Sequence, residues 1–325
     1  MSDMKNPFQG KGRRYNDFNG FLRRTFGVRV HKISLDAGLG CPNRDGTISS
    51  AGCIYCNERG SGTGAWQQGL SVREQILRAQ TYLRKRFKAE KFLAYFQSFS
   101  NTYAPQKRLE ALYREALEPD DMAGLCIGTR PDCVPEETLA MIQGFTEAYM
   151  VWLEYGLQSF HNRTLTLINR GHTVKAFLDA VQRTRMRGIN VCVHVILGLP
   201  GEDTRDMMET ADRLSMLDIQ GIKIHLLYVV KGTPLARLYE REEYACLTRE
   251  EYVDILISFL ARLRPDIIIQ RLTGDPHPED LLAPSWALDK GKVLALIQAR
   301  MEEEDAWQGK NHTGHSDTCA SSPEG

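Results

Sequence analysis

The chain has 325 residues, 42% hydrophobic and 25% charged, which are the proportions of an ordinary folded protein rather than a disordered or disulfide-scaffold one. Lysine and arginine together number 41, as do aspartate and glutamate, so a globally basic nucleic-acid-binding protein is disfavoured and no DNA partner is expected. No apolar run approaches the roughly 18 residues of a transmembrane helix. The first residues lack the apolar stretch of a signal peptide, so we expect a cytoplasmic protein without a membrane partner.

Short apolar runs alternate with amphipathic segments along most of the chain. Strands buried on both faces are apolar nearly throughout, and on this basis we expect strands at Val30–Asp36, Phe92–Phe99, Gly124–Gly128, Met150–Leu157, Asn190–Leu197 and Ile222–Val229. Capping boxes, Ser71 with Glu74 and Thr248 with Glu251, mark the starts of two of the intervening helices. The alternation predicts an α/β fold with a parallel sheet. Six units favour a partial (β/α)6 barrel or a doubly wound sheet over a closed eight-stranded barrel.

We expect four segments in this architecture. An N-terminal segment, 1–28, precedes the partial barrel at 29–263. A small C-terminal helical cap at 264–301 contains the short run Asp266–Gln270 and a helix ending near Met301. From 302 to 325 the chain is polar, which predicts a disordered tail.

Three of the eight cysteines lie close together, directly after the first expected strand. Cys41, Cys53 and Cys56 have the spacing C-x11-C-x2-C, in a loop at the end of the sheet where parallel α/β folds build their sites. Thiolates select zinc or iron–sulfur clusters. A structural zinc site would need a fourth ligand, for which His31 and Cys133 are candidates. A [4Fe–4S] cluster held by three thiolates would leave one iron open for a substrate or cofactor.

This loop, with Tyr55 just before its last cysteine, resembles the radical S-adenosylmethionine (SAM) superfamily. The gap between the first two cysteines is wider than the usual C-x3-C-x2-C, and in this it resembles the branch that contains the Elongator catalytic subunit. Further stretches that follow the expected strands resemble the YhcC-type bacterial members of the superfamily: Tyr95–Pro105, Gly128–Asp132, Glu154–Ser159, Asn169–His172, Gly198–Gly201 and Gly232–Leu235.

The resemblance implies a radical SAM enzyme that uses two cofactors, a [4Fe–4S] cluster and SAM. Cys41, Cys53 and Cys56 would be the cluster ligands, and the open iron would bind the amine and carboxylate of SAM. Electron transfer from the reduced cluster would cleave SAM to a 5′-deoxyadenosyl radical that abstracts a substrate hydrogen. A one-electron donor of the flavodoxin or ferredoxin type is then an expected partner.

Four residues near the first and second strands match the positions of SAM contacts. Tyr55 would face the adenine, or simply shield the cluster. Gln97, Ser98 and Asn101 stand where the superfamily often has a glycine-rich stretch that receives the SAM amine. Their side chains could accept from an ammonium group, but polar residues there are also ordinary loop caps.

Four further candidates follow or lie within the fourth and fifth strands. Gln158 and Arg170 resemble positions that contact the SAM ribose and carboxylate, although a surface ion pair also explains Arg170. Glu154 lies in an apolar strand, where an unpartnered carboxylate is costly, which favours a role in the site. His194 would contact the ribose, or be a satisfied core residue.

The Elongator-like branch acts on the wobble uridine of tRNA, so the resemblance implies a tRNA base, above all the wobble uridine side chain, as substrate. The basic stretches Arg84–Lys88 and Arg183–Arg187 agree with an RNA partner, although solvated helix faces also explain them. Two alternatives stay open. Gly198–Pro200 and Gly232–Pro234 resemble radical SAM porphyrinogen oxidases, which implies a small-molecule substrate. The chain could also be a non-catalytic binding module stabilised by zinc.

Overall fold

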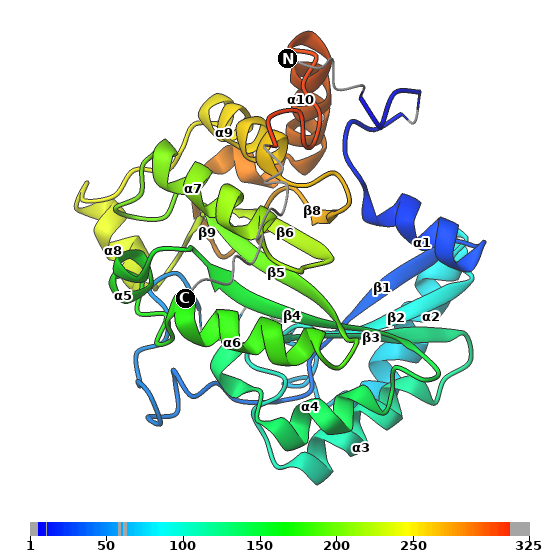
Figure 1. Cartoon of the computed structure of the whole chain (residues 1–325). Coiled ribbons are helices and arrows are strands. Elements are labelled where there is room, and N and C mark those ends of the chain that lie inside the picture. The colour runs from blue at the N-terminus through cyan, green and yellow to red at the C-terminus, as the bar shows by residue number, and fades with distance from the viewer. Residues whose placement is uncertain (1–5, 11, 58–59, 61–63, 313–325) are drawn as a thin grey trace, which may run out of the picture.

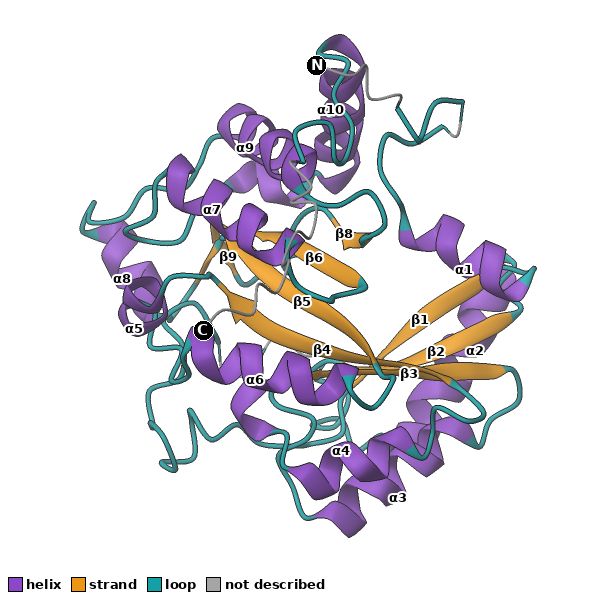
Figure 2. Cartoon of the chain, viewed as in Figure 1, coloured by secondary structure: helices purple, strands orange, loops and turns teal. Residues whose placement is uncertain are grey.

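A computed structural model describes residues 6–10, 12–57, 60 and 64–312. Within them, one sheet is formed entirely of parallel pairs, and Figure 2 shows it curled into a partial barrel with most of the helices outside. Its strands, in spatial order, are β1 (Val30–Leu35), β2 (Lys91–Phe96), β3 (Met122–Thr129), β4 (Met150–Gln158), β5 (Asn190–Leu197), β6 (Gly221–Leu226) and β8 (Ile268–Arg271). The expected partial α/β barrel is therefore confirmed.

The helices on the outer face follow the strands in chain order (Figure 1). They are α2 (Val72–Phe87), α3 (Gln106–Leu117), α4 (Glu136–Gln143), α6 (Val174–Arg185), α7 (Thr204–Ser215) and α9 (Arg249–Arg262). Both expected capping boxes are present, at Ser71 with Glu74 and at Thr248 with Glu251. The apolar faces of these helices and the outward side chains of the strands form the main core.

Three short helices lie in loops that follow strands. They are η1 (Pro131–Cys133), α5 (Asn162–Leu167) and α8 (Pro234–Glu240), after β3, β4 and β7 respectively. These loops extend from the carboxyl ends of the strands, where parallel α/β folds place their sites.

The sheet has a seventh strand that the six-strand expectation did not contain. β8 pairs in parallel with β6, so part of the segment expected in the C-terminal cap belongs to the sheet. The sixth expected run divides into β6 and a short β7 (Val229–Val230), which pairs antiparallel with β9 (Leu281–Ala283). η2 (Ser285–Leu288) and α10 (Lys290–Glu303) complete this region.

The segment before β1 packs against the barrel. α1 (Phe18–Phe26) contacts β1 and β8, the two edge strands of the sheet (Figure 1). Phe18 and Phe21 meet Trp152 of β4 edge-on, with ring centroids 6.0 and 6.1 Å apart. Because the barrel is only partly closed, apolar side chains inside it would otherwise be exposed. α1 covers these side chains.

The last described residues are packed, unlike the expected disordered tail over 302–325. Ala306, Trp307 and Gln308 are buried. The Gln308 side chain donates to the carbonyls of Arg264 (2.6 Å) and Ile267 (2.8 Å) and accepts from the backbone amide of Asn16 (2.9 Å). These hydrogen bonds satisfy the polar atoms of the buried Gln308 side chain. The polar composition of this segment alone would suggest that the side chain is exposed to solvent. Residues 313–325 lie outside the described part of the chain.

No helix in the described ranges is long and apolar enough to cross a membrane.

Candidate active site

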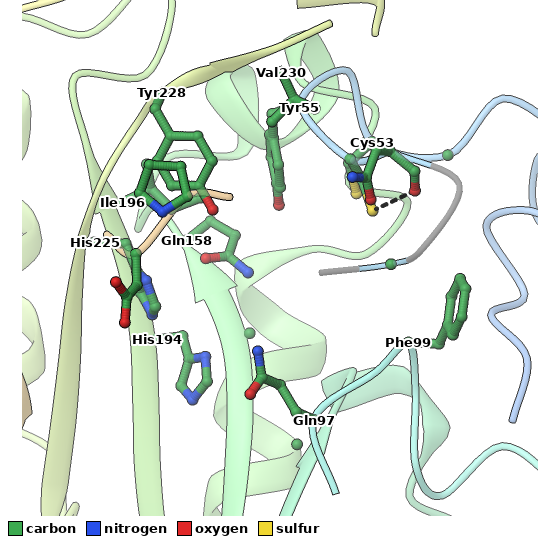
Figure 3. A pocket seen from close by; sticks show the side chains of 18 of the residues that line it. Cys53, Tyr55, Gln97, Phe99, Gln158, His194, Ile196, His225, Tyr228 and Val230 are labelled. Atoms are coloured by element: carbon green, nitrogen blue, oxygen red, sulfur yellow. Dashed lines mark hydrogen bonds between the residues drawn. The ribbon is translucent and has the colours of Figure 1, made fainter. Parts of the chain in front are cut away.

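A cavity of about 780 Å³ opens at the carboxyl ends of the strands. Cys41, Cys53 and Cys56 line it from the loop after β1, together with Tyr55. Figure 3 shows Cys53 and Tyr55 on one side of this space and side chains of β5 and β6 on the other. The three sequence-predicted cysteines therefore face one chamber that is also lined by residues from every later strand, β2 to β8.

Backbone hydrogen bonds hold the cysteine loop in place. The amide of Ile54 donates to the carbonyl of Ile168 after α5 (3.1 Å), and the carbonyl of Ile54 accepts from the amide of Leu235 in α8 (2.9 Å). Gly52, at φ +71°, supplies the left-handed turn just before Cys53. The loop is thus tied to two elements far away in the sequence.

Two donors converge on the sulfur of Cys53. Asn43 Nδ2 lies 3.6 Å from Cys53 Sγ, and Arg170 Nη1 lies 3.5 Å from it. The buried Arg170 guanidinium also donates to the Gly156 carbonyl through Nε (3.1 Å) and Nη2 (2.7 Å). These contacts fix the position of the Cys53 side chain at the wall of the cavity.

The three cysteine sulfurs are not gathered as tightly as the ligands of a single metal ion. Sulfurs on one tetrahedral zinc, bound at about 2.3 Å, lie about 3.8 Å apart. The one group of three possible ligands within 4.8 Å of one another in the described residues does not include these cysteines. His31, a candidate fourth zinc ligand, stacks on Phe87 of α2 instead. Cys133, the other, does not line the cavity.

The structure divides the predicted SAM contacts into two groups. Six of the eight line the cavity: Tyr55, Gln97, Glu154, Gln158, Arg170 and His194. Ser98 and Asn101 do not line it and are almost fully buried. Asn101 Nδ2 donates to the carbonyls of Phe96 (3.1 Å) and Gly128 (2.8 Å), so its amide ties the ends of β2 and β3 together.

Gly156 makes room for two of these side chains. A Cβ at this position would lie 2.5 Å from Arg170 Nη2 and 2.7 Å from Gln158 Nε2. Gln158 itself has φ +78°, at a register shift between β4 and β5. The irregular end of β4 therefore turns Gln158 into the cavity while Arg170 reaches Cys53.

In the wall of the cavity, Glu154 is the centre of a charge network. Its carboxylate accepts from Lys32 Nζ of β1 (2.7 Å), from Lys223 Nζ of β6 and from His194 Nε2 of β5 (2.8 Å). Burial raises the pKa of Glu154, but Lys223 and Lys32 outweigh it and hold that pKa well below the usual range. Glu154, Cys192 and His194 could together ligate a metal, but the two lysines already occupy the carboxylate.

Sequence reasoning missed Lys32 and Lys223. Each is the single lysine, arginine or carboxylate residue of its strand, as Glu154 is in β4. Three such charges on separate strands are the signal that could have predicted an internal ion pair.

His194 should give the protein a measurable acid sensitivity. Burial, followed by the charge of Lys223, lowers its pKa to about 4 from 6.5. Between pH 6.5 and 4 the unfolded chain therefore binds a proton that the folded chain does not, so stability falls as the pH drops through this window, by roughly 3 kcal/mol in total. We expect His194→Gln, which can still donate to Glu154, to flatten that slope in urea unfolding measured from pH 7 to 4.

The control for this prediction is His277→Gln, at an exposed histidine. Equal pH slopes in wild type and His194→Gln would show that His194 is not the group responsible.

Comparison with known proteins identifies the family. A model described as the Radical SAM superfamily matches residues 38–214, and one described as the Radical_SAM C-terminal domain matches 219–303. YtqA of Bacillus subtilis is 40% identical over 94% of both chains. YhcC of Escherichia coli is 38% identical over 89% of this chain and 92% of its own length.

Two further similarities lie in the Elongator-like branch. The tRNA uridine(34) acetyltransferase of Methanocaldococcus jannaschii is 32% identical over 43% of this chain, but only 26% of its own length is covered. The solved structure of archaeal Elp3 from Methanocaldococcus infernus has a TM-score of 0.66 at 17% identity, covering 86% of this chain and 64% of that one. The chain belongs to the radical SAM superfamily and is an enzyme whose cofactors are a [4Fe–4S] cluster and SAM.

Proposed function

We propose that this radical SAM enzyme modifies a base of tRNA, the side chain of the wobble uridine being the leading candidate. The observation that carries this is the similarity of 150 residues to an enzyme named for uridine 34 of tRNA. The resemblance in fold to an Elp3 structure agrees with it. We also propose a cytoplasmic location and a one-electron donor of the flavodoxin or ferredoxin type.

Cys41, Cys53 and Cys56 are the residues that would hold the cluster. When bound, the reduced cluster supplies the electron that cleaves SAM and begins radical chemistry. The three thiols at one end of the cavity leave room for a fourth, non-protein ligand, because the described residues offer no further cysteine lining this space. Arg170 and Asn43 hold Cys53 in place for that role, and partners of this kind typically change metal affinity ten- to a hundredfold.

The residues around the cavity would bind SAM and exclude water. Tyr55 presents an aromatic ring beside the cysteines, where it can lie against the adenine. Gln158 and Gln97, from the ends of β4 and β2, offer amide donors and acceptors for the ribose and the amine. A mostly enclosed chamber protects a reactive species from solvent and limits its attack to the bound substrate.

The test is the nucleoside content of tRNA from a strain that lacks the gene. Mass spectrometry of hydrolysed tRNA should show one modified nucleoside lost and its precursor accumulated. A plasmid carrying the wild-type gene should restore the modified nucleoside, and one carrying Cys53→Ala should not. Identical nucleoside profiles in the wild-type and deletion strains would refute a tRNA substrate. A small molecule, such as a porphyrinogen, would then be the favoured substrate.

A further inference from the structure

The end of the cavity away from the cysteines contains a second set of polar side chains. Arg271 ends β8, His225 lies in β6, and Tyr228 follows β6; all three line the cavity. Figure 3 shows His225 and Tyr228 across the space from Cys53. None of these three positions is needed to hold the cysteine loop.

Arg271 brings a positive charge into the cavity. Among the described residues, its side chain has no hydrogen-bond or ion-pair partner. Arg271 lines the same cavity as His225 and Tyr228. The side chain is half-buried. A guanidinium has five N–H donors in a planar fork, suited to two oxygens of one carboxylate or phosphate.

His225 and Tyr228 add neutral groups beside this charge. His225 Nε2 is buried and has no hydrogen-bond partner in the described residues. Burial, and then the charge of Arg271, keep the pKa of His225 well below its usual value, so the ring is neutral. Burial raises the pKa of Tyr228, so its hydroxyl keeps its proton and can donate. A buried ring nitrogen without a partner is costly, which indicates that a ligand supplies the missing bond.

The charge network around Glu154 is also positive in sum. Lys32 and Lys223 carry two charges against the single carboxylate of Glu154, and His194 is neutral at pH 7. Asp275, Glu279 and Asp280 also line the cavity, and of these Asp275 is paired with Lys290 at 2.8 Å. Arg271 adds its own positive charge to that of the network, which favours an anionic ligand beside it.

We propose that Arg271, together with His225 and Tyr228, binds an anionic oxygen group of the substrate, a phosphate or a carboxylate. The inference rests on the proposed function, because it takes that group as part of the same substrate. In an RNA it is the backbone phosphate beside the base that enters the cavity. In a small molecule it is a phosphate or carboxylate substituent.

The experiment compares wild type with Arg271→Gln, both with the reconstituted cluster and under anaerobic conditions. Calorimetry measures binding of inorganic phosphate, of a tRNA anticodon stem-loop and of SAM. Losing a charge-assisted, two-point contact should weaken phosphate and stem-loop binding by about tenfold to a hundredfold. SAM affinity should not change. Tyr228→Phe should weaken the binding of phosphate and of the stem-loop severalfold. Such a loss would show that binding at this site does not depend on charge alone.

The matched control is Arg213→Gln, at an exposed arginine of α7 that pairs with Glu209; it should bind all three ligands as wild type does. If wild type binds phosphate but not the stem-loop, and Arg271→Gln loses the phosphate, the anion site stands and the RNA proposal fails. If Arg271→Gln binds phosphate and stem-loop like wild type, the anion site is refuted. Loss of SAM affinity alone in Arg271→Gln would also refute it, because Arg271 would then serve the SAM carboxylate.

Discussion

Replacing Cys53 by alanine is expected to abolish both cluster binding and SAM cleavage. Cys53 is the most buried of the three loop cysteines, and both Asn43 and Arg170 direct N–H groups at its sulfur. Apart from Cys41 and Cys56, which would be ligands themselves, no described cysteine lines the cavity to replace it. After anaerobic reconstitution and reduction, wild type should give a [4Fe–4S]⁺ electron paramagnetic resonance signal that changes when SAM is added. Cys53→Ala should give no such signal and should release 5′-deoxyadenosine only at background.

Cys246→Ala is the matched control for this result. Cys246 is a free, half-buried cysteine beside Tyr244, outside the residues that line the cavity. Its loss should leave the iron content and the signal unchanged. A Cys53→Ala protein that kept a SAM-responsive signal would contradict the assignment of the cluster ligands, and bound zinc in place of iron in wild type would contradict the cluster itself.

Replacing Glu154 by glutamine is expected to have the largest effect on stability. Glu154 is fully buried and is the partner of Lys32 and Lys223, so an amide there leaves one partly buried and one buried ammonium group without a countercharge. Breaking a buried pair by removing one partner typically costs about 3–5 kcal/mol. Urea unfolding at pH 7, followed by circular dichroism, should show a loss of this size.

The pH dependence of stability and a second variant distinguish the loss of the countercharge from poor packing of the glutamine side chain. The pKa of Glu154 lies below that of the unfolded carboxyl, so its contribution is complete above pH 4.5 and disappears only as the pH falls towards the folded pKa. Glu154→Gln/Lys223→Met, with one ammonium group fewer, should recover part of the loss. Glu243→Gln, at an exposed pair with Arg241, should change stability by at most about 1 kcal/mol. A loss below that level at Glu154 would show that the network does not stabilise the barrel.

The strands buried on both faces were the most predictable part of the fold. The expected strand Asn190–Leu197 coincides with β5, and the starts of β1 and β4 also agree. β8 was not expected as a strand because its run is only four residues long and follows Pro265, so local pattern could not distinguish it from a loop. Its pairing with β6 depends on tertiary contacts across more than forty residues.

The part of the candidate site that depends on the spacing of residues within one loop was predictable. The part that depends on ion pairs between distant strands was less so. Three cysteines in one loop are close in any fold, so their convergence could be predicted. Lys32 and Glu154 are 122 residues apart, and Lys223 and Glu154 are 69 apart, so their contact follows only from strand order and register. Asn101 was predicted as a SAM contact because it stands where the superfamily often has a glycine-rich stretch, but backbone carbonyls at the ends of β2 and β3 already accept from its amide.

The bonds of Gln308 have a consequence for the order of events during synthesis. Asn16 and Gln308 are separated by 292 residues, and Asp17 bridges to Ile269 of β8. Because a ribosome releases the chain from its N-terminus onwards, the first helix must wait for almost the whole chain before these contacts can form. The N-terminal segment is therefore among the last parts of the barrel to be fixed in place, although it is the first to be synthesised.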